Sequence, residues 1–277
     1  MGLMLKFRSK RILHEEKTKY FKIIVADTEI LGKMLLLEEK GDMTIQTAER
    51  FDSYDEMLAH IPLAAHPNPK RVLIVGGGDG VVLREVLKYD FVERVVLVEI
   101  DKKVISVSKK YLKLDNGALD NSKVELVIAD AAKYVNRCKE KFDVVIADYS
   151  DPYENTVAEA LIREEFYAGI QRILDRSGIA VFQSGSPIFQ KNMLLHIYRS
   201  LRSVFRIVKV FWAAIPYYPG GIWTFTVASN LIDPSKPIRN PPSKTIYYNT
   251  TIHKASFILP EFIREILDAA EGSKEQK

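Results

Sequence analysis

The sequence predicts an α/β protein whose parallel sheet is covered by helices on both faces. Between Arg71 and Asp101, a short apolar run, a glycine-rich turn, a helical apolar pattern and a second apolar run form a strand–turn–helix–strand unit. Strand and helix patterns then alternate to about residue 204, as is typical of a parallel sheet. Apolar runs at 206–212 and 222–229 flank a Pro/Gly turn and predict a closing β-hairpin. A seven-stranded sheet ending in an antiparallel pair indicates a Rossmann-like fold of the methyltransferase type.

The elements of this main domain are expected at regular intervals. Strands are predicted at 72–75, 95–98, 124–128, 143–147 and 178–183, and helices at 81–88, 102–111, 130–137, 158–174, 188–204 and from Pro260 to about Ala270.

A small N-terminal antiparallel β domain is expected before this sheet. Tyr20–Ala26 alternates apolar and polar residues, Gly32–Leu37 is a second apolar run, and a third strand is expected at Met43–Thr47 after a turn. The chain is therefore divided into an N-terminal β-strand domain, 1–55, and a Rossmann-like catalytic domain, 56–277.

A helix is predicted to follow the N-terminal strands. Ser53 is expected to cap a helix from Tyr54 to His60, with Glu56 completing a capping box. The proline-containing tract 66–70 separates this helix from the main sheet.

The composition narrows the class of protein. The 277 residues are 47% hydrophobic, which is enough for a substantial core. The net charge is +4 with both signs interleaved, which favours a solvated surface over a nucleic-acid interface. The single cysteine, Cys138, excludes an internal disulfide and fits a reducing compartment. No signal peptide or membrane span is evident, so we expect a cytoplasmic protein without nucleic-acid or membrane partners.

The glycine turn contains an unusual acid. In nucleotide-binding sheets the turn from Gly76 to Gly80 would approach the ligand, with Gly76 and Gly78 leaving room for it. Asp79 would repel the phosphates of a dinucleotide or nucleoside triphosphate. A cationic adenosyl ligand would instead be attracted. The turn therefore predicts an adenosyl sulfonium compound that carries an amine near Asp79.

Acidic residues follow the strands throughout the predicted sheet. Ligands of open α/β sheets bind beyond the carboxyl ends of the strands, where six acids are expected here: Asp79, Glu99, Asp101, Asp130, Asp148 and Asp151. Together they imply a basic partner or a polycationic ligand. For Asp101 and Asp130 taken singly, a helix N-cap is an equally good interpretation. No histidine joins the acids at ligand spacing, so no metal site is predicted.

Several motifs together resemble the spermidine synthase, or polyamine aminopropyltransferase, family. The resemblance covers the chain from about Tyr54 to Phe262 and rests on Gly76-Gly77-Gly78-Asp79-Gly80, Val98-Glu99-Ile100-Asp101, Asp148-Tyr149-Ser150-Asp151-Pro152, Glu164-Glu165-Phe166-Tyr167, Tyr218-Pro219-Gly220-Gly221 and His253…Ala255-Ser256-Phe257…Leu259-Pro260.

The resemblance implies transfer of an aminopropyl group from decarboxylated S-adenosylmethionine to an amine, with release of 5′-methylthioadenosine. Such an enzyme would serve polyamine and spermidine biosynthesis with the adenosyl donor as a co-substrate and without a prosthetic group. Glu99 would hold the ribose hydroxyls, and Asp130 with the backbone at Ala131 would hold the adenine edge. Asp79 would distinguish the decarboxylated donor by charge. We also expect a homo-oligomer, either a dimer or a tetramer.

The resemblance also assigns the amine side of the site. Asp148 matches the family's proton acceptor. An amine with a pKa of about 10 is protonated at neutral pH, so it needs such a group before it can attack. Asp151, Tyr54 and Tyr218 would anchor amines, and Gln183 would face the acceptor.

The chain departs from the family pattern at several places, including the stretch 45–48 and Asp130-Ala131. Phe21 replaces a glutamine that contacts the nucleoside, Asp55 replaces an acceptor-site histidine, and a longer loop occupies 153–157. We hypothesise that Asp55 adds charge to the acceptor channel. This would favour spermidine, agmatine or a diamine of another length over putrescine.

Two other functions remain open on the same fold. One is an S-adenosylmethionine-dependent small-molecule methyltransferase, whose donor carboxylate Asp79 would repel. The other is a non-catalytic polyamine- or nucleoside-binding paralogue, against which the presence of Asp148 and Asp151 speaks.

Overall fold

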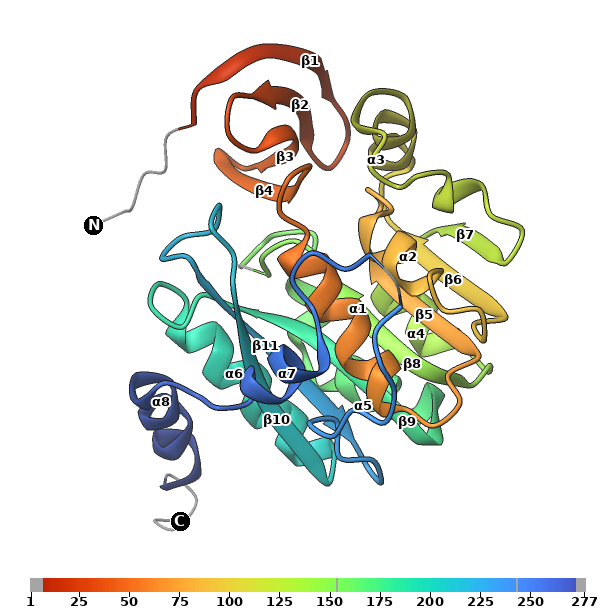
Figure 1. The fold of residues 1–277 in the computed structure, drawn as a ribbon, viewed down its shortest axis with the longest axis vertical. Helices are drawn as coiled ribbons and strands as arrows, with labels where there is room; N and C mark the ends of the chain where they lie inside the picture. Colours follow the sequence, from red (N-terminus) through yellow and green to blue (C-terminus); the bar gives the residue numbers. More distant parts are fainter. Residues whose placement is uncertain (1–6, 153, 243, 273–277) are drawn as a thin grey trace.

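The computed structural model describes residues 7–152, 154–242 and 244–272, which form a four-stranded sheet and a larger seven-stranded α/β unit (Figure 1). The smaller sheet is antiparallel, in the order β1(Ser9–Lys17), β2(Lys22–Thr28), β3(Gly32–Glu39), β4(Asp42–Ala48). The sequence predicts its last three strands but misses β1. That strand is polar and largely exposed, so it has no apolar face that would identify it, and its pairing with β2 defines it instead.

The large sheet confirms the predicted fold class. Its strands are β5(Arg71–Gly76), β6(Arg94–Glu99), β7(Val124–Ile128), β8(Phe142–Asp148), β9(Leu174–Gly185), β10(Ile207–Ala214) and β11(Ile222–Ser229). The spatial order is β10-β11-β9-β8-β5-β6-β7. Strands β9, β8, β5, β6 and β7 are mutually parallel, and β11 lies antiparallel between β9 and β10. This is the seven-stranded arrangement with a closing hairpin that the sequence predicts.

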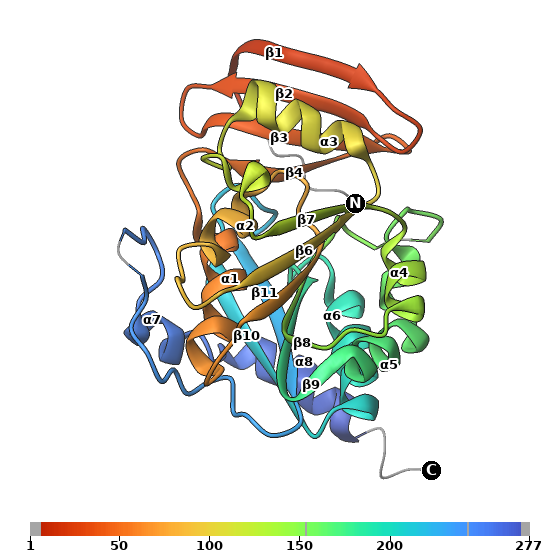
Figure 2. The same ribbon diagram turned by 90° about the vertical axis from the view of Figure 1, so that its right-hand side faces the viewer.

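Helices cover both faces of the large sheet, as Figure 2 shows. The alternation of β5 illustrates the layers, because Val72 and Ile74 join one buried cluster and Leu73 and Val75 join the other. The first cluster contains α1(Ser53–Ala65) and α2(Val81–Val86). The second contains α4(Ala131–Arg137), α5(Glu164–Ile173), α6(Lys191–Val204) and α8(Glu261–Gly272).

A third buried cluster joins the two sheets. Phe21, directly before β2, and Ile23 and Leu35 of the small sheet pack with Val104 and Val107 of α3(Lys102–Val107), which lies against that sheet (Figure 2). Since this contact is apolar, it fixes the small sheet over one edge of the large one. The division into domains 1–55 and 56–277 is kept as a proposal, and its boundary falls within the first turn of α1.

Some helices differ from the predicted ranges. The expected helix at 158–174 is split into a 3₁₀ turn, Glu159–Ile162, and α5, because Arg163 between them is extended. The helix expected at 102–111 continues beyond α3 as a π-helical turn, Ser108–Leu112. The short α7(Thr250–Ala255) was not predicted. Within the residues described, no helix has the length and apolarity needed to span a membrane.

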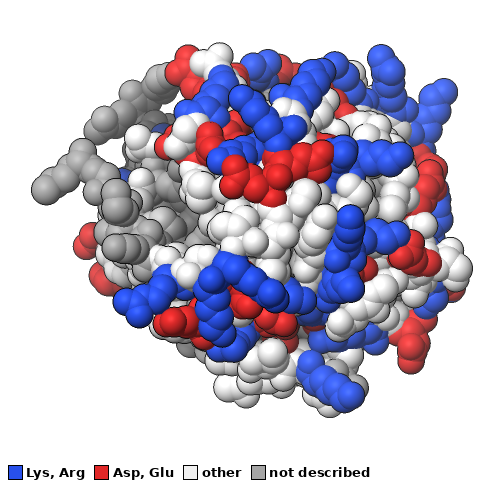
Figure 3. All heavy atoms as spheres, turned by 90° about the horizontal axis from the view of Figure 1, so that it is seen from above, with Lys and Arg blue, Asp and Glu red and all other residues white. Residues whose placement is uncertain are grey.

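Charged residues of both signs are mixed on the face formed by the small sheet. Figure 3 shows Lys and Arg next to Asp and Glu over this face. Such mixing gives no extended patch of a single sign.

The prediction for the start of α1 is wrong in its details. Asp52 occupies the N-cap position, and Ser53 Oγ donates to the carbonyl of Ala214, 2.9 Å away, instead of capping the helix. The helix also continues through Pro62 to Ala65. All its residues are buried, so tertiary packing offsets the hydrogen bond that proline removes.

Glu56 acts across the molecule and not in a capping box. Its buried carboxylate accepts the backbone N–H groups of Ile246, Tyr247 and Tyr248 at 2.6, 2.8 and 2.7 Å. The backbone N–H groups of residues 246–248 therefore have one side chain of α1 as their hydrogen-bond acceptor.

Replacing Glu56 with alanine should destabilise the fold. The change leaves buried N–H groups without their acceptor, so we expect the free energy of unfolding to fall by about 2–4 kcal/mol. Urea denaturation of Glu56→Ala beside Glu265→Ala, an exposed control on α8, measures the effect. Equal stability of the two variants would contradict this interpretation.

Candidate active site

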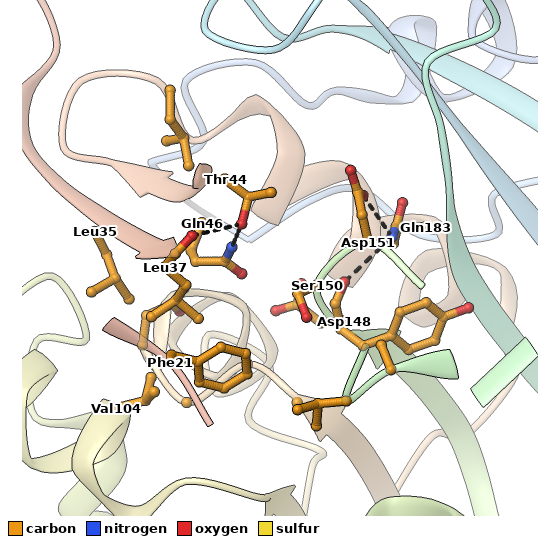
Figure 4. A pocket seen from close by; sticks show the side chains of 18 of the residues that line it. Phe21, Leu35, Leu37, Thr44, Gln46, Val104, Asp148, Ser150, Asp151 and Gln183 are labelled. Carbon is orange, nitrogen blue, oxygen red and sulfur yellow. Dashed lines mark hydrogen bonds between the residues drawn. The ribbon is translucent and has the colours of Figure 1, made fainter. Parts of the chain in front are cut away.

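A cavity of about 330 Å³ lies between the small sheet and the carboxyl ends of β5, β6 and β8. Its walls combine apolar side chains of the small sheet with polar groups at the strand ends (Figure 4). All the predicted site residues except Asp55 line it: Tyr54, Gly76, Gly78, Asp79, Glu99, Asp130, Ala131, Asp148, Asp151, Gln183 and Tyr218.

The glycine turn brings the backbone of β5 against its neighbours. Gly76 has a φ of +81°, and a Cβ there would lie 2.0 Å from the carbonyl oxygen of Asp148. A Cβ on Gly78 would lie 2.7 Å from Glu99 Oε2. These two positions therefore exclude side chains and keep the turn next to both acids.

Asp79 is buried within this turn. Its Oδ1 accepts the N–H of Val81 at 2.8 Å, at the start of α2. Burial raises the pKa of Asp79 to about 6, although the Val81 N–H and the charge of Arg84 lower it. The carboxyl therefore titrates close to neutral pH.

Glu99 ends β6 on the same side of the cavity. Burial raises its pKa to about 7, and hydrogen bonds from the backbone N–H groups of Asp101 and Ile100 oppose that rise. The carboxyl thus lies between the glycine turn and the start of α3.

Asp101 and Asp130 both cap helices, but only one of them lines the cavity. Asp101 Oδ1 accepts the N–H of Lys103 at 2.9 Å, and its Oδ2 accepts the hydroxyl of Thr18 at 2.5 Å. Asp130 accepts the N–H of Lys133 at 3.1 Å and also lines the cavity with Ala131. The N-cap interpretation therefore accounts for Asp101, while Asp130 is placed for both roles.

Asp148, at the end of β8, is joined to α1. The Tyr54 hydroxyl donates to Asp148 Oδ1 at 3.0 Å. Burial, together with the charge of Asp79, raises the pKa of Asp148 to about 8, and the hydrogen bond from Tyr54 lowers it. A carboxyl with this pKa is a far better proton acceptor than an ordinary aspartate.

Asp151 and Gln183 lie together beyond Asp148 (Figure 4). Gln183 Nε2 donates to Asp151 Oδ1 at 3.4 Å and to the carbonyl of Tyr149 at 3.3 Å. Tyr218 comes from the turn between β10 and β11, and its ring packs edge-on against Tyr54 at 5.6 Å between centroids. Polar groups from three separate segments thus meet at this end of the cavity.

Asp55, predicted to add charge to the acceptor channel, is not among the residues that line the cavity. Asp55 is only 1% exposed, and its Oδ2 has no hydrogen-bond partner among the described residues. Burial, followed by the charges of Asp79 and Asp148, raises the pKa of Asp55 well above its ordinary value. The side chain turns into the protein, and its effect on acceptor choice stays a prediction.

The other departures from the family pattern do border the cavity. Phe21 is part of its wall, beside Leu35 and Leu37 of β3 (Figure 4). In the loop after Asp151, the Val157 N–H donates to Glu39 Oε1 at 2.8 Å. Tyr153 of that loop lies outside the described residues. A smaller hollow of about 90 Å³ adjoins the loop and shares Phe21, Thr44 and Asp151 with the main cavity.

The apolar wall of the cavity was not predicted from the sequence. Leu35, Leu37 and Val104 contribute to it, as do Tyr217 and Trp223 near the hairpin. The alternation in β3 places Leu35 and Leu37 on one face, which was an available signal. Nothing in the sequence indicated that this face meets the large sheet. In the residues that the structure describes, no group of three or more His, Cys, Asp or Glu is arranged to hold a metal ion.

The fold and the position of the cavity define the class of protein: a Rossmann-like α/β protein of the methyltransferase type with an acid-lined site at the strand ends. The family model "Spermine/spermidine synthase domain" matches residues 51–236. The chain therefore belongs to the spermine/spermidine synthase family, and it is an enzyme of the transferase class.

Curated relatives and solved structures agree with this assignment. A polyamine aminopropyltransferase of Clostridium tetani is 42% identical over 96% of this chain and 94% of its own length. A polyamine aminopropyltransferase of a Thermoanaerobacter species is 43% identical over 96% of this chain and 95% of its own length. A spermidine synthase in complex with the transition state analogue AdoDATO has a TM-score of 0.89 at 36% identity, covering 95% of this chain and 90% of its own. Spermidine synthase from Thermotoga maritima has a TM-score of 0.87 at 36% identity, covering 95% and 89%.

The raised pKa values of the acids predict pH-dependent binding of cations. Asp79, Glu99 and Asp148 lose protons at pH values of about 6, 7 and 8, whereas a small diamine remains protonated there. We expect its affinity, measured by calorimetry, to rise between pH 6 and pH 8.5. An affinity that is constant or falls over this range would contradict the prediction.

The same shifts predict the pH dependence of stability without ligand. The folded protein holds protons on these carboxyls that the unfolded chain has already lost, so the stability they contribute is present at low pH. It is lost as the pH rises towards 8. Thermal unfolding with and without the diamine should therefore show the largest stabilisation by the ligand at about pH 8.5, the upper end of the pH range tested.

Proposed function

We propose that this enzyme transfers the aminopropyl group of decarboxylated S-adenosylmethionine to an amine and releases 5′-methylthioadenosine. The observation that carries the proposal is the meeting of Asp79, Asp148 and Asp151 in one cavity beside the glycine turn. Three carboxyls at one site suit two ligands that together carry several positive charges. A sulfonium donor with an amine tail and a polyamine acceptor are such ligands. The names of the relatives and the analogue-bound structure support the same reaction.

The donor would lie across the strand ends of β5, β6 and β7. Glu99 would accept hydrogen bonds from the ribose hydroxyls, and Asp130 with the backbone of Ala131 would bind the adenine edge. Gly76 and Gly78 keep side chains out of the turn, so the backbone can approach the nucleoside. Asp79 would pair with the ammonium of the donor's aminopropyl group.

Asp148 would act as the general base. The protonated acceptor amine cannot attack until it loses a proton, and the raised pKa of Asp148, about 8, makes that transfer less unfavourable. The neutral nitrogen then attacks the aminopropyl carbon bound to sulfur. A C–N bond forms as the C–S bond breaks, and the bonding pair goes to sulfur to give the neutral thioether. Tyr54 holds the Asp148 carboxyl in place through its 3.0 Å hydrogen bond.

The acceptor would be a diamine or polyamine. Asp151, Tyr218 and Gln183, which line the cavity, would bind its ammonium group and chain. Putrescine, giving spermidine, is the first acceptor to test, with cadaverine, agmatine and spermidine beside it. Product formation from decarboxylated S-adenosylmethionine, followed by chromatography, tests both reaction and acceptor.

Replacing Asp148 should abolish most catalysis without preventing donor binding. Asp148→Asn keeps the size of the side chain and removes the base, so we expect kcat to fall by about 10²–10⁴-fold. Affinity for 5′-methylthioadenosine should remain within about threefold. A variant with nearly wild-type kcat would show that another group accepts the proton.

Replacing Asp79 should weaken the choice between donors. Asp79→Asn removes the charge that attracts the donor's ammonium and repels the carboxylate of S-adenosylmethionine. We expect the ratio of the dissociation constants of S-adenosylmethionine and its decarboxylated form, measured by calorimetry, to fall by about 10–100-fold. If the wild type binds S-adenosylmethionine more tightly than the decarboxylated form, the site is that of a methyltransferase.

The expected effect of Asp55 on the acceptor can be tested with the same panel. An Asp55→His variant should shift the order of preference towards shorter or less cationic amines if Asp55 contributes charge. An unchanged order would reject that role and agree with its buried position.

The expected homo-oligomeric state and cytoplasmic location also remain proposals. Light scattering after gel filtration measures the oligomeric state.

A further inference from the structure

A second glutamine contacts Asp151 from outside the cavity wall. Gln190 Nε2 donates to Asp151 Oδ2 at 2.6 Å, while Gln183 Nε2 reaches the other oxygen, Oδ1, at 3.4 Å. The carboxylate therefore receives an amide N–H on each oxygen, and the contact with Gln190 is the shorter.

The backbone between these glutamines fixes the direction of both amides. Gln183 Oε1 accepts the N–H of Gly185 at 3.1 Å, and Gln190 Oε1 accepts the N–H of Ser186 at 2.7 Å. Because each amide oxygen is occupied by a backbone donor, each NH₂ group is directed at Asp151.

The segment itself is held in shape around Gln190. Gly185 has a φ of +80°, and a Cβ there would lie 2.7 Å from Gln190 Oε1. The Gln190 N–H donates to the Ser186 carbonyl at 2.8 Å, and Ser186 Oγ donates to the Pro219 carbonyl at 3.1 Å. The segment thus connects Asp151 with the turn that carries Tyr218.

We propose that Gln190 is a positioning residue for the amine acceptor, acting through Asp151. With Gln183 it holds the Asp151 carboxylate in place on the cavity wall. Asp151 lies beside Gln183, on the side of the cavity opposite Phe21 and Val104 (Figure 4), where the acceptor is proposed to bind. The inference rests on the proposed function, since it assumes that Asp151 binds an ammonium group.

Steady-state kinetics of two variants test the proposal. Gln190→Glu places a second carboxylate against Asp151, and Gln190→Leu removes both amide contacts. We expect the KM for the amine to rise about tenfold or more in Gln190→Glu and about threefold or more in Gln190→Leu. The KM for the donor should stay within about twofold. Gln171→Leu is the matched control, because Gln171 binds the Val204 carbonyl instead of the site.

The pH dependence separates positioning from a structural role. In Gln190→Glu, the introduced carboxyl can again donate a hydrogen bond to Asp151 once it is protonated. The ratio of amine KM between this variant and the wild type should therefore shrink as the pH is lowered. A ratio that does not change with pH, an unchanged amine KM, or an equal rise in both KM values would overturn the proposal. Calorimetric binding of 5′-methylthioadenosine to each variant verifies that the donor side is folded.

The same variants distinguish failure of this inference from failure of the proposed function. If the wild type transfers no aminopropyl group to any amine, the proposed function fails. Calorimetric affinity for a diamine then replaces KM, and it should still weaken in Gln190→Glu. If the wild type is active and both variants keep its amine KM, the function stands and the role of Gln190 is rejected.

Discussion

The close approach of the glycine turn to the end of β8 is the contact on which the site depends. The Gly77 N–H donates to the Asp148 carbonyl at 2.9 Å, and Gly76 leaves no room for a side chain between them. Because β5 and β8 are adjacent parallel strands, this hydrogen bond continues their ladder into the turn. It places the Asp79 turn and the Asp148 carboxyl at one end of one cavity. A residue with a Cβ at position 76 would separate them.

Concentrating carboxyls in one cavity carries an electrostatic cost in the ligand-free protein. Burial and mutual repulsion raise the pKa of Asp148, and burial raises those of Asp79 and Glu99, so part of the negative charge is neutralised by protons near neutral pH. Arg84 offsets part of this negative charge. It forms an ion pair with Asp52 at 2.9 Å, and its positive charge lowers the pKa of Asp79. A cationic ligand must displace these protons, so its net gain is largest at a pH where the carboxyls are already ionised. The acids therefore lower the stability of the empty site and raise its affinity for cations.

The sequence predicted the parts of the structure that depend on local pattern and on general rules for sheets. Strand–helix alternation indicated the large sheet, and the rule that ligands bind at strand ends correctly grouped Asp79, Glu99 and Asp148. The errors concern contacts between distant segments. Glu56 fits a capping box locally, yet its partners lie about 190 residues away. Asp55 matches a family motif position, but packing of α1 buries it and it does not line the cavity. Strand β1 is defined by pairing and not by apolar alternation.

This contrast explains why the proposed donor side of the site is more predictable than the proposed acceptor side. Gly76, Glu99 and Asp130 lie at or just beyond strand ends, where backbone geometry fixes their positions. The proposed acceptor side combines the end of β9 with the segments 151–152, 154–157, 186–190 and 215–221, and side-chain contacts such as those between Asp151 and the two glutamines hold it together. Loops tolerate change that a sheet does not. On the proposed function, we therefore expect the determinants of acceptor choice in this chain to lie in those segments.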